Sequence, residues 1–102
     1  MRLGKIVIND RVFKTIIKKY GIKSLSVFGS SLRRDFHDNS DIDLLLEFEK
    51  PSEKSLFDLI DLRLELEDIT GRKIDIIEKG SIKNPYKRKE IYSTARTVYA
   101  AQ

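Results

Sequence analysis

Two stretches of the sequence decide the fold: Val27-Phe28-Gly29-Ser30-Ser31-Leu32-Arg33 and, after a short polar loop, Ser40-Asp41-Ile42-Asp43-Leu44-Leu45-Leu46. Each stretch contains an apolar run of the kind that forms a strand, and a glycine–serine turn with a polar loop separates the two runs. Because successive side chains of a strand alternate between its faces, we expect Asp41 and Asp43 to point the same way. The second strand therefore begins with two neighbouring carboxylates.

These paired carboxylates repel each other, and the repulsion costs stability unless a positive charge lies between them. Magnesium, a hard cation that prefers oxygen ligands, is the candidate. A further aspartate, Asp75, lies in the middle of the stretch Lys73–Glu78, where an aspartate is unfavourable in a strand. If that strand neighbours the strand of Asp41 and Asp43, three carboxylates can converge on one face of the sheet and suit two magnesium ions. The glycine–serine turn would then hold the phosphates of a nucleotide.

The composition indicates a single globular domain that spans residues 1–102, since 40% of the residues are apolar and 35% are charged. The sequence contains no cysteine, which excludes disulfides and thiolate metal sites. We also find no apolar run long enough for a membrane span and no signal peptide, so the simplest expectation is a cytoplasmic protein. The formal charge of +4 is compatible with an anionic partner such as a nucleotide or RNA.

Apolar spacing and capping residues predict the element order helix, strand, strand, helix, strand, helix. The expected helices cover Asn9–Tyr20, Ser55–Thr70 and Asn84–Tyr99, and the expected strands cover Ser24–Phe28, Asp41–Phe48 and Lys73–Glu78. In the second strand, alternate apolar residues share the face that should pack on helices: Ile42, Leu44, Leu46 and Phe48. The order predicts an α/β fold in which helices pack on one face of a small β-sheet.

The motifs together resemble the signature of the minimal nucleotidyltransferases of the DNA polymerase beta superfamily. That signature has Gly-Ser, an arginine three residues after the serine, and then Ser-Asp-x-Asp-Leu. Here it is matched by Gly29-Ser30, by Arg33 and by Ser40–Leu44. The leading helix and the later carboxylate Asp75 extend the resemblance over nearly the whole chain. It implies the DNA polymerase beta-like nucleotidyltransferase fold, with a small mixed β-sheet.

Short stand-alone members of this family are often antitoxins encoded beside HEPN-domain ribonuclease toxins. The resemblance implies a transfer of AMP from ATP to a tyrosine of such a toxin, with the two proteins in a hetero-oligomer. Asp41 and Asp43 would bind two magnesium ions, and Asp75 would complete the shell of the catalytic ion and help to deprotonate the acceptor hydroxyl. Gly29 and Ser30 would hold the β- and γ-phosphates.

Two further residues of the signature, Arg33 and Ser40, are carried over to the nucleotide-binding site. Arg33 would support the phosphates or the acceptor. Many family members have Ala-Arg-Gly where this chain has Leu32-Arg33-Arg34, which adds a positive charge to the loop and removes a glycine from it.

Two other functions stay open on the sequence. The same chemistry could act on RNA or on a small molecule, although a chain of 102 residues leaves little room for a separate acceptor-binding domain. Alternatively, the chain could neutralise a toxin by stoichiometric contact without catalysis. The basic residues of the last expected helix fit a solvated face, and they could also dock an acidic partner or RNA: Lys87, Arg88, Lys89 and Arg96.

Overall fold

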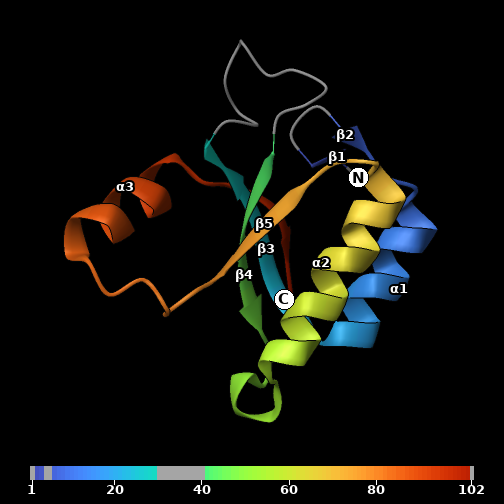
Figure 1. Ribbon diagram of the computed structural model, residues 1–102, viewed down its shortest axis with the longest axis horizontal. Coiled ribbons are helices and arrows are strands. Elements are labelled where there is room, and N and C mark those ends of the chain that lie inside the picture. The colour runs from blue at the N-terminus through green and yellow to red at the C-terminus, as the bar shows by residue number, and fades with distance from the viewer. Residues whose placement is uncertain (1, 4–5, 30–40, 102) are drawn as a thin grey trace.

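The computed structural model describes residues 2–3, 6–29 and 41–101 and has α-helices on both sides of a four-stranded sheet (Figure 1). The helices are α1 (Asp10–Tyr20), α2 (Leu56–Thr70) and α3 (Pro85–Thr94), with a short 3₁₀ helix at Pro51–Glu53. The strands are β1 (Arg2–Leu3), β2 (Ile6–Val7), β3 (Ile22–Phe28), β4 (Ile42–Phe48), β5 (Ile74–Glu78) and β6 (Arg96–Ala100).

The main sheet has the strand order β5-β4-β3-β6, and β1 pairs with β2 in a separate two-stranded ribbon. β3 runs antiparallel to both β4 and β6, whereas β4 and β5 run parallel to each other. A parallel pair needs a long crossover, and α2 supplies it. The mixed α/β sheet expected from the sequence is therefore confirmed.

Local signals place the first two helices as the sequence predicts. The Asn9 side chain accepts a hydrogen bond from the backbone N–H of Arg11 at 2.9 Å, and α1 ends before Gly21. Asp58 accepts a hydrogen bond from the backbone N–H of Ser55 at 2.8 Å, as part of a capping box at the start of α2. Both helices consequently begin within a residue of the expected positions.

The main hydrophobic core lies between the sheet and the pair α1 and α2. The alternate β4 residues Ile42, Leu44, Leu46 and Phe48 all belong to it, as predicted. From α1 and α2 they meet the buried side chains Phe13, Ile16, Ile17, Tyr20, Leu62 and Leu66. This packing fixes which face of β4 turns towards the helices, and with it the face on which the intervening aspartates lie.

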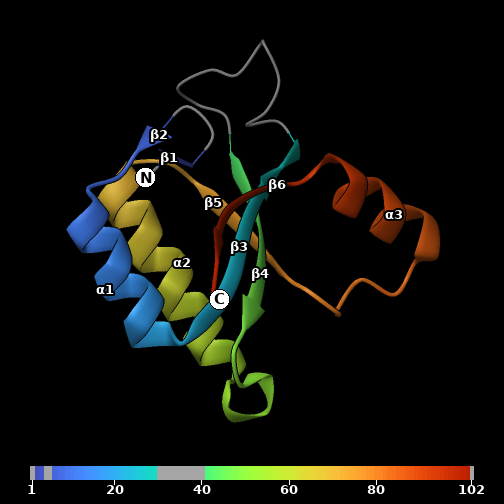
Figure 2. The same cartoon turned by 180° about the vertical axis from the view of Figure 1, so that it is seen from behind.

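The third helix lies on the opposite side of the sheet from α1 and α2, as both views show (Figures 1 and 2), so the expectation that the helices pack on one face is wrong for α3. It is anchored by Ile91, which is buried in a small cluster with Leu45 and Ile82. Leu45 lies between Leu44 and Leu46, and all three leucines are buried. Because β4 is apolar on both faces here, one pair of helices cannot cover it, and α3 covers part of the second face.

The expectation of one continuous helix from Asn84 to Tyr99 is wrong at its C-terminal end. α3 ends at Thr94, and Arg96–Ala100 forms β6, which pairs antiparallel with β3 in a register that places Tyr99 beside Leu25. The run Thr97-Val98-Tyr99 consists of β-branched and aromatic residues, which favour a strand. Pairing with β6 also provides hydrogen-bond partners for backbone N–H and C=O groups of β3, which would lack them if α3 continued to Tyr99. The ribbon of β1 and β2 was not expected from the sequence.

Among the described residues, none of the helices combines the length and the apolar character that a membrane crossing requires.

A polar contact joins α1 to α2 beside the main core. The Tyr20 hydroxyl donates a hydrogen bond to Oε2 of Glu65 at 2.6 Å, and Nζ of Lys19 lies 3.1 Å from the same oxygen. The hydrogen bond from Tyr20, with a smaller contribution from Lys19, holds the pKa of Glu65 below its ordinary value of 4.5. A lowered folded-state pKa stabilises the fold above pH 4.5, and this contribution is lost as the pH falls through the folded-state pKa.

Tyr20→Phe is expected to lower the free energy of unfolding at pH 7 by about 1–2 kcal/mol, because it removes a hydrogen bond to a carboxylate that is partly solvated. It should also weaken the loss of stability below pH 4.5, since the pKa of Glu65 then returns towards its ordinary value. Urea unfolding from pH 3 to pH 7 measures both effects. Tyr86→Phe is the control, because Tyr86 is 86% exposed and its change should stay within about 0.5 kcal/mol. Equal curves for Tyr20→Phe and the wild type would contradict the prediction.

Candidate active site

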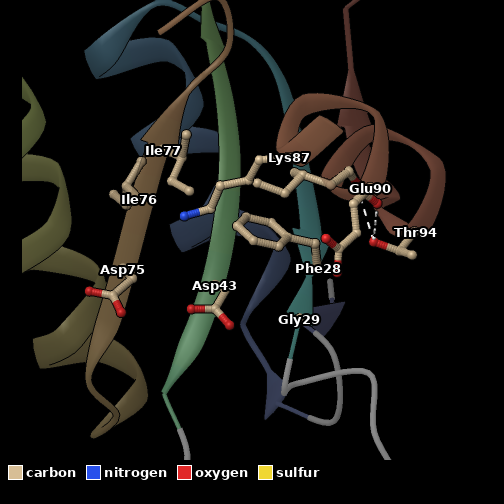
Figure 3. A pocket seen from close by; sticks show the side chains of 10 residues that line it. Phe28, Gly29, Asp43, Asp75, Ile76, Ile77, Lys87, Glu90 and Thr94 are labelled. Atoms are coloured by element: carbon tan, nitrogen blue, oxygen red, sulfur yellow. Dashed lines mark hydrogen bonds between the residues drawn. The ribbon is translucent and has the colours of Figure 1, made fainter. Parts of the chain in front are cut away.

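Asp43 of β4 and Asp75 of β5 are direct neighbours across the sheet. The two strands pair in parallel with Asp43 in register with Asp75, and neighbouring strands lie about 4.8 Å apart. Asp43 is flanked by the buried core residues Ile42 and Leu44, so its own side chain projects from the opposite face. Figure 3 shows both carboxylates on the same side of the sheet. The sequence prediction that Asp75 lies beside the β4 aspartates is thus confirmed for Asp43.

Gly29 brings the backbone close to this carboxylate pair. It directly follows Phe28, the β3 residue that pairs with Asp43. The backbone φ of Gly29 is +71°, and a Cβ added there would overlap with Oδ2 of Asp43 and lie 3.2 Å from its Cγ. Only glycine combines this backbone conformation with so close an approach to the carboxylate. The absence of a side chain at position 29 therefore gives the Asp43 carboxylate room to lie against the backbone of Gly29.

A cavity of about 460 Å³ lies over the carboxylate pair, between the sheet and α3. Its lining residues come from the ends of β3, from β4 and β5, and from α3: Phe28, Gly29, Asp43, Asp75, Ile76, Ile77, Lys87, Glu90, Ile91 and Thr94. Its size is in the range of sites for small molecules and cofactors. The apolar side chains offer contact area for an organic group, while the two carboxylates offer ligands for a cation.

The third predicted carboxylate, Asp41, lies just before β4 and is half-buried. Within residues 2–3, 6–29 and 41–101, no group of three acidic or histidine side chains is close enough to hold a metal ion. The structure brings together Asp43 and Asp75, and the convergence of Asp41 with them remains a prediction. Three further predicted residues, Ser30, Arg33 and Ser40, lie outside the described residues.

The donor set of this site fits magnesium. Asp43 and Asp75 offer carboxylate oxygens from neighbouring strands, and oxygen is the ligand that this cation prefers. Because Gly29 has no side chain, the Asp43 carboxylate lies close to its backbone, at the cavity that both residues line.

Sequence reasoning missed the α3 wall of the cavity, which is formed by Lys87, Glu90 and Thr94. Lys87 precedes the buried Ile91 by one helical turn and therefore shares its face of α3. That spacing is the signal in the sequence, but it is informative only if the inward face of the helix is known. A helix with a single buried residue gives too weak a periodicity to reveal that face.

Comparisons with known proteins agree with this arrangement. The nucleotidyltransferase domain family matches residues 10–98 of the chain. A relative from Methanocaldococcus jannaschii, named as a putative protein adenylyltransferase, is 45% identical over 82 residues, which cover 79% of this chain and 82% of the relative. The protein adenylyltransferase MntA of Thermococcus cleftensis is 34% identical over 71 residues, which cover 70% of each chain.

A solved structure shares the fold at lower sequence similarity. It is a crystal structure of a toxin–antitoxin with AMP-PNP, matched with a TM-score of 0.72 and 15% identity over 93% of this chain and 76% of that chain. Together with the carboxylate pair, the glycine beside it and the match over residues 10–98, these findings show that the chain belongs to the nucleotidyltransferase domain family and is a nucleotidyltransferase.

Proposed function

We propose that this protein is an antitoxin that transfers AMP from ATP to a tyrosine hydroxyl of a HEPN-type ribonuclease toxin and thereby silences the toxin. The observation that carries the proposal is the register of Asp43 with Asp75, which places two carboxylates under a cavity beside Gly29. The names of two sequence relatives, both protein adenylyltransferases, support AMP as the transferred group and a protein as the acceptor.

The reaction is an in-line displacement at the α-phosphorus of ATP. The acceptor oxygen forms a bond to this phosphorus while the bond from the phosphorus to the bridging oxygen of diphosphate breaks, so diphosphate leaves. The proton of the hydroxyl is taken up by a carboxylate oxygen, and we assign this role to Asp75, whose exposed position at the sheet surface supports the assignment. Most of the rate acceleration would come from positioning the two reactants and from compensating the negative charge of the phosphates.

Magnesium would be held by Asp41, Asp43 and Asp75, in a site for two ions. When bound, it supplies positive charge for the triphosphate and the leaving diphosphate. Without that charge, the carboxylates would repel the anionic substrate, so we expect strictly magnesium-dependent activity.

The phosphates of ATP would lie beside the turn that follows β3. Gly29 allows close approach of the backbone, and its neighbour Ser30 would add a backbone N–H and a hydroxyl. Arg33 and Ser40 would complete the nucleotide site. This assignment rests on the family signature, and for Gly29 the close approach of its backbone to the Asp43 carboxylate supports it.

The acceptor would be supplied by a partner protein in a hetero-oligomer. The sheet, two helices on one face and one helix on the other account for nearly all of the described chain, and the cavity of about 460 Å³ is the size of a nucleotide site. RNA is the alternative acceptor, and the test below includes it as a competitor.

The test is to incubate the protein with ATP, magnesium and the HEPN-type protein encoded by the neighbouring gene, and to weigh the products. We expect the toxin to gain mass in steps of one AMP, to lose ribonuclease activity in proportion, and to gain nothing when magnesium is chelated. Tandem mass spectrometry then identifies the modified residue. RNA and free nucleotides serve as competing acceptors. Toxin neutralisation without any gain in mass would support stoichiometric contact and overturn the proposal.

A further inference from the structure

One cation of α3 lies at the carboxylate-lined cavity. Lys87 lines the cavity together with Asp43 and Asp75, although it comes from a helix on the far side of that space. Figure 3 shows its side chain leaving α3 and reaching across towards β4 and β5, on the side of the sheet that carries the two carboxylates. The cavity also has apolar lining residues, such as Ile76 and Ile77, along which the aliphatic part of a lysine can lie while its ammonium group approaches a polar ligand.

The orientation of Lys87 follows from how α3 is anchored. Ile91 is the buried residue of this helix and packs against Leu45 of β4. A residue four positions earlier lies on the same helical face, so Lys87 must turn towards the sheet whenever Ile91 is docked. Lys89 is rotated by about 200° from Lys87 around the helix axis and does not line the cavity. The two lysines therefore point in different directions, although both are exposed, positively charged residues of the same helix.

Lys87 has no structural task that the described part of the chain reveals. Its side chain is exposed and belongs to neither of two ion pairs seen among the described residues, which join Lys19 to Glu65 and Lys79 to Glu47. The Lys87 side chain extends towards two carboxylates of the described chain and forms no ion pair with either of them. Its ammonium group is therefore available to an anionic group that enters between the lysine and the carboxylates. In a site for a nucleoside triphosphate, that group is a phosphate, which needs more positive charge than a site lined by aspartates provides.

We propose that Lys87 is a nucleotide-binding residue whose ammonium group contacts the polyphosphate of ATP from the α3 side of the cavity. This inference rests on the proposed function and adds to it a phosphate ligand that the loop signature does not contain. Its consequence is that α3 is part of the nucleotide site. The packing of Ile91 on Leu45 then controls the position of a substrate-binding cation.

The experiment compares three proteins: the wild type, Lys87→Ala, and the control Lys89→Ala, which removes the same charge from the outer face of α3. Binding of AMP-PNP with magnesium is measured by calorimetry, and binding of adenosine, which lacks phosphates, by NMR titration. We expect Lys87→Ala to weaken AMP-PNP binding about tenfold to a hundredfold and to leave adenosine binding unchanged. Lys89→Ala should change both by less than about twofold, and Lys87→Arg should recover part of the affinity.

The outcomes separate this inference from the proposed function. Wild-type binding of AMP-PNP and AMP transfer to the toxin, combined with undiminished binding by Lys87→Ala, would overturn the role of Lys87 alone. An equal loss in Lys89→Ala would assign the effect to overall charge, and a parallel loss of adenosine binding would assign it to the fold of α3; either result would overturn the inference. A higher KM for the toxin with unchanged AMP-PNP binding would place Lys87 on the acceptor side and would also overturn it. If the wild type binds no AMP-PNP and transfers no AMP, both proposals fail.

Discussion

Asp43→Asn is expected to reduce AMP transfer at least about a hundredfold while the protein stays folded. The asparagine keeps the shape of the side chain and removes its charge, so the proposed magnesium site would lose a carboxylate ligand. Charge stabilisation by a metal ion contributes several kcal/mol to a transition state, and each 1.36 kcal/mol is tenfold in rate. The rate is measured from the AMP-sized mass increment of the toxin at saturating ATP and magnesium.

Stability provides the second readout of this variant. Like charges on directly neighbouring residues of a sheet destabilise it by about 0.2–1 kcal/mol, and the register of Asp43 with Asp75 creates such a pair. The free energy of unfolding of Asp43→Asn without metal should therefore lie within about 1 kcal/mol of the wild type. Asp68→Asn, in an exposed position of α2, is the control and should keep full activity. Retained transfer by Asp43→Asn would remove this aspartate from the catalytic site.

The carboxylate pair could be predicted from the sequence because it depends on short-range rules. Alternation within β4 fixes the face of Asp43 once Ile42, Leu44 and Leu46 are assigned to the core, and all three are buried. The adjacency of Asp75 needed one more assumption, that β4 and β5 are neighbours. Consecutive elements joined by a helix often meet that assumption, and it is met here.

The region after β5 was harder to predict because its structure depends on distant partners. Thr97-Val98-Tyr99 forms a strand in contact with β3, whose free edge lies more than sixty positions earlier in the chain. The position of α3 likewise depends on Leu45, an apolar residue on the face of β4 that also carries Asp43. Neither contact leaves a local signature, so the helix was expected to run too far and its cavity-lining residues were missed.

Gly29→Ala is expected to cause two separable losses, one of stability and one of activity. At the φ of +71° an alanine costs about 1–2 kcal/mol relative to glycine, which should lower the free energy of unfolding by that amount. The new Cβ would also overlap with Oδ2 of Asp43 and force the carboxylate to rotate away from the cavity. A misplaced reacting group of this kind costs about a hundredfold in rate. Urea unfolding and AMP transfer, assayed where the variant remains folded, measure the two losses.

Gly71→Ala separates the backbone effect from the contact with Asp43. Gly71 follows α2 with a φ of +68°, almost the same as that of Gly29, and a Cβ added there would meet no atom within 4 Å. The two alanine variants should therefore lose similar stability, and Gly71→Ala should transfer AMP at the wild-type rate when folded. If both variants lost activity to the same extent, backbone strain or partial unfolding would explain the loss. Only a loss confined to Gly29→Ala supports the inference that glycine at position 29 is needed to keep the Asp43 carboxylate in its place at the cavity.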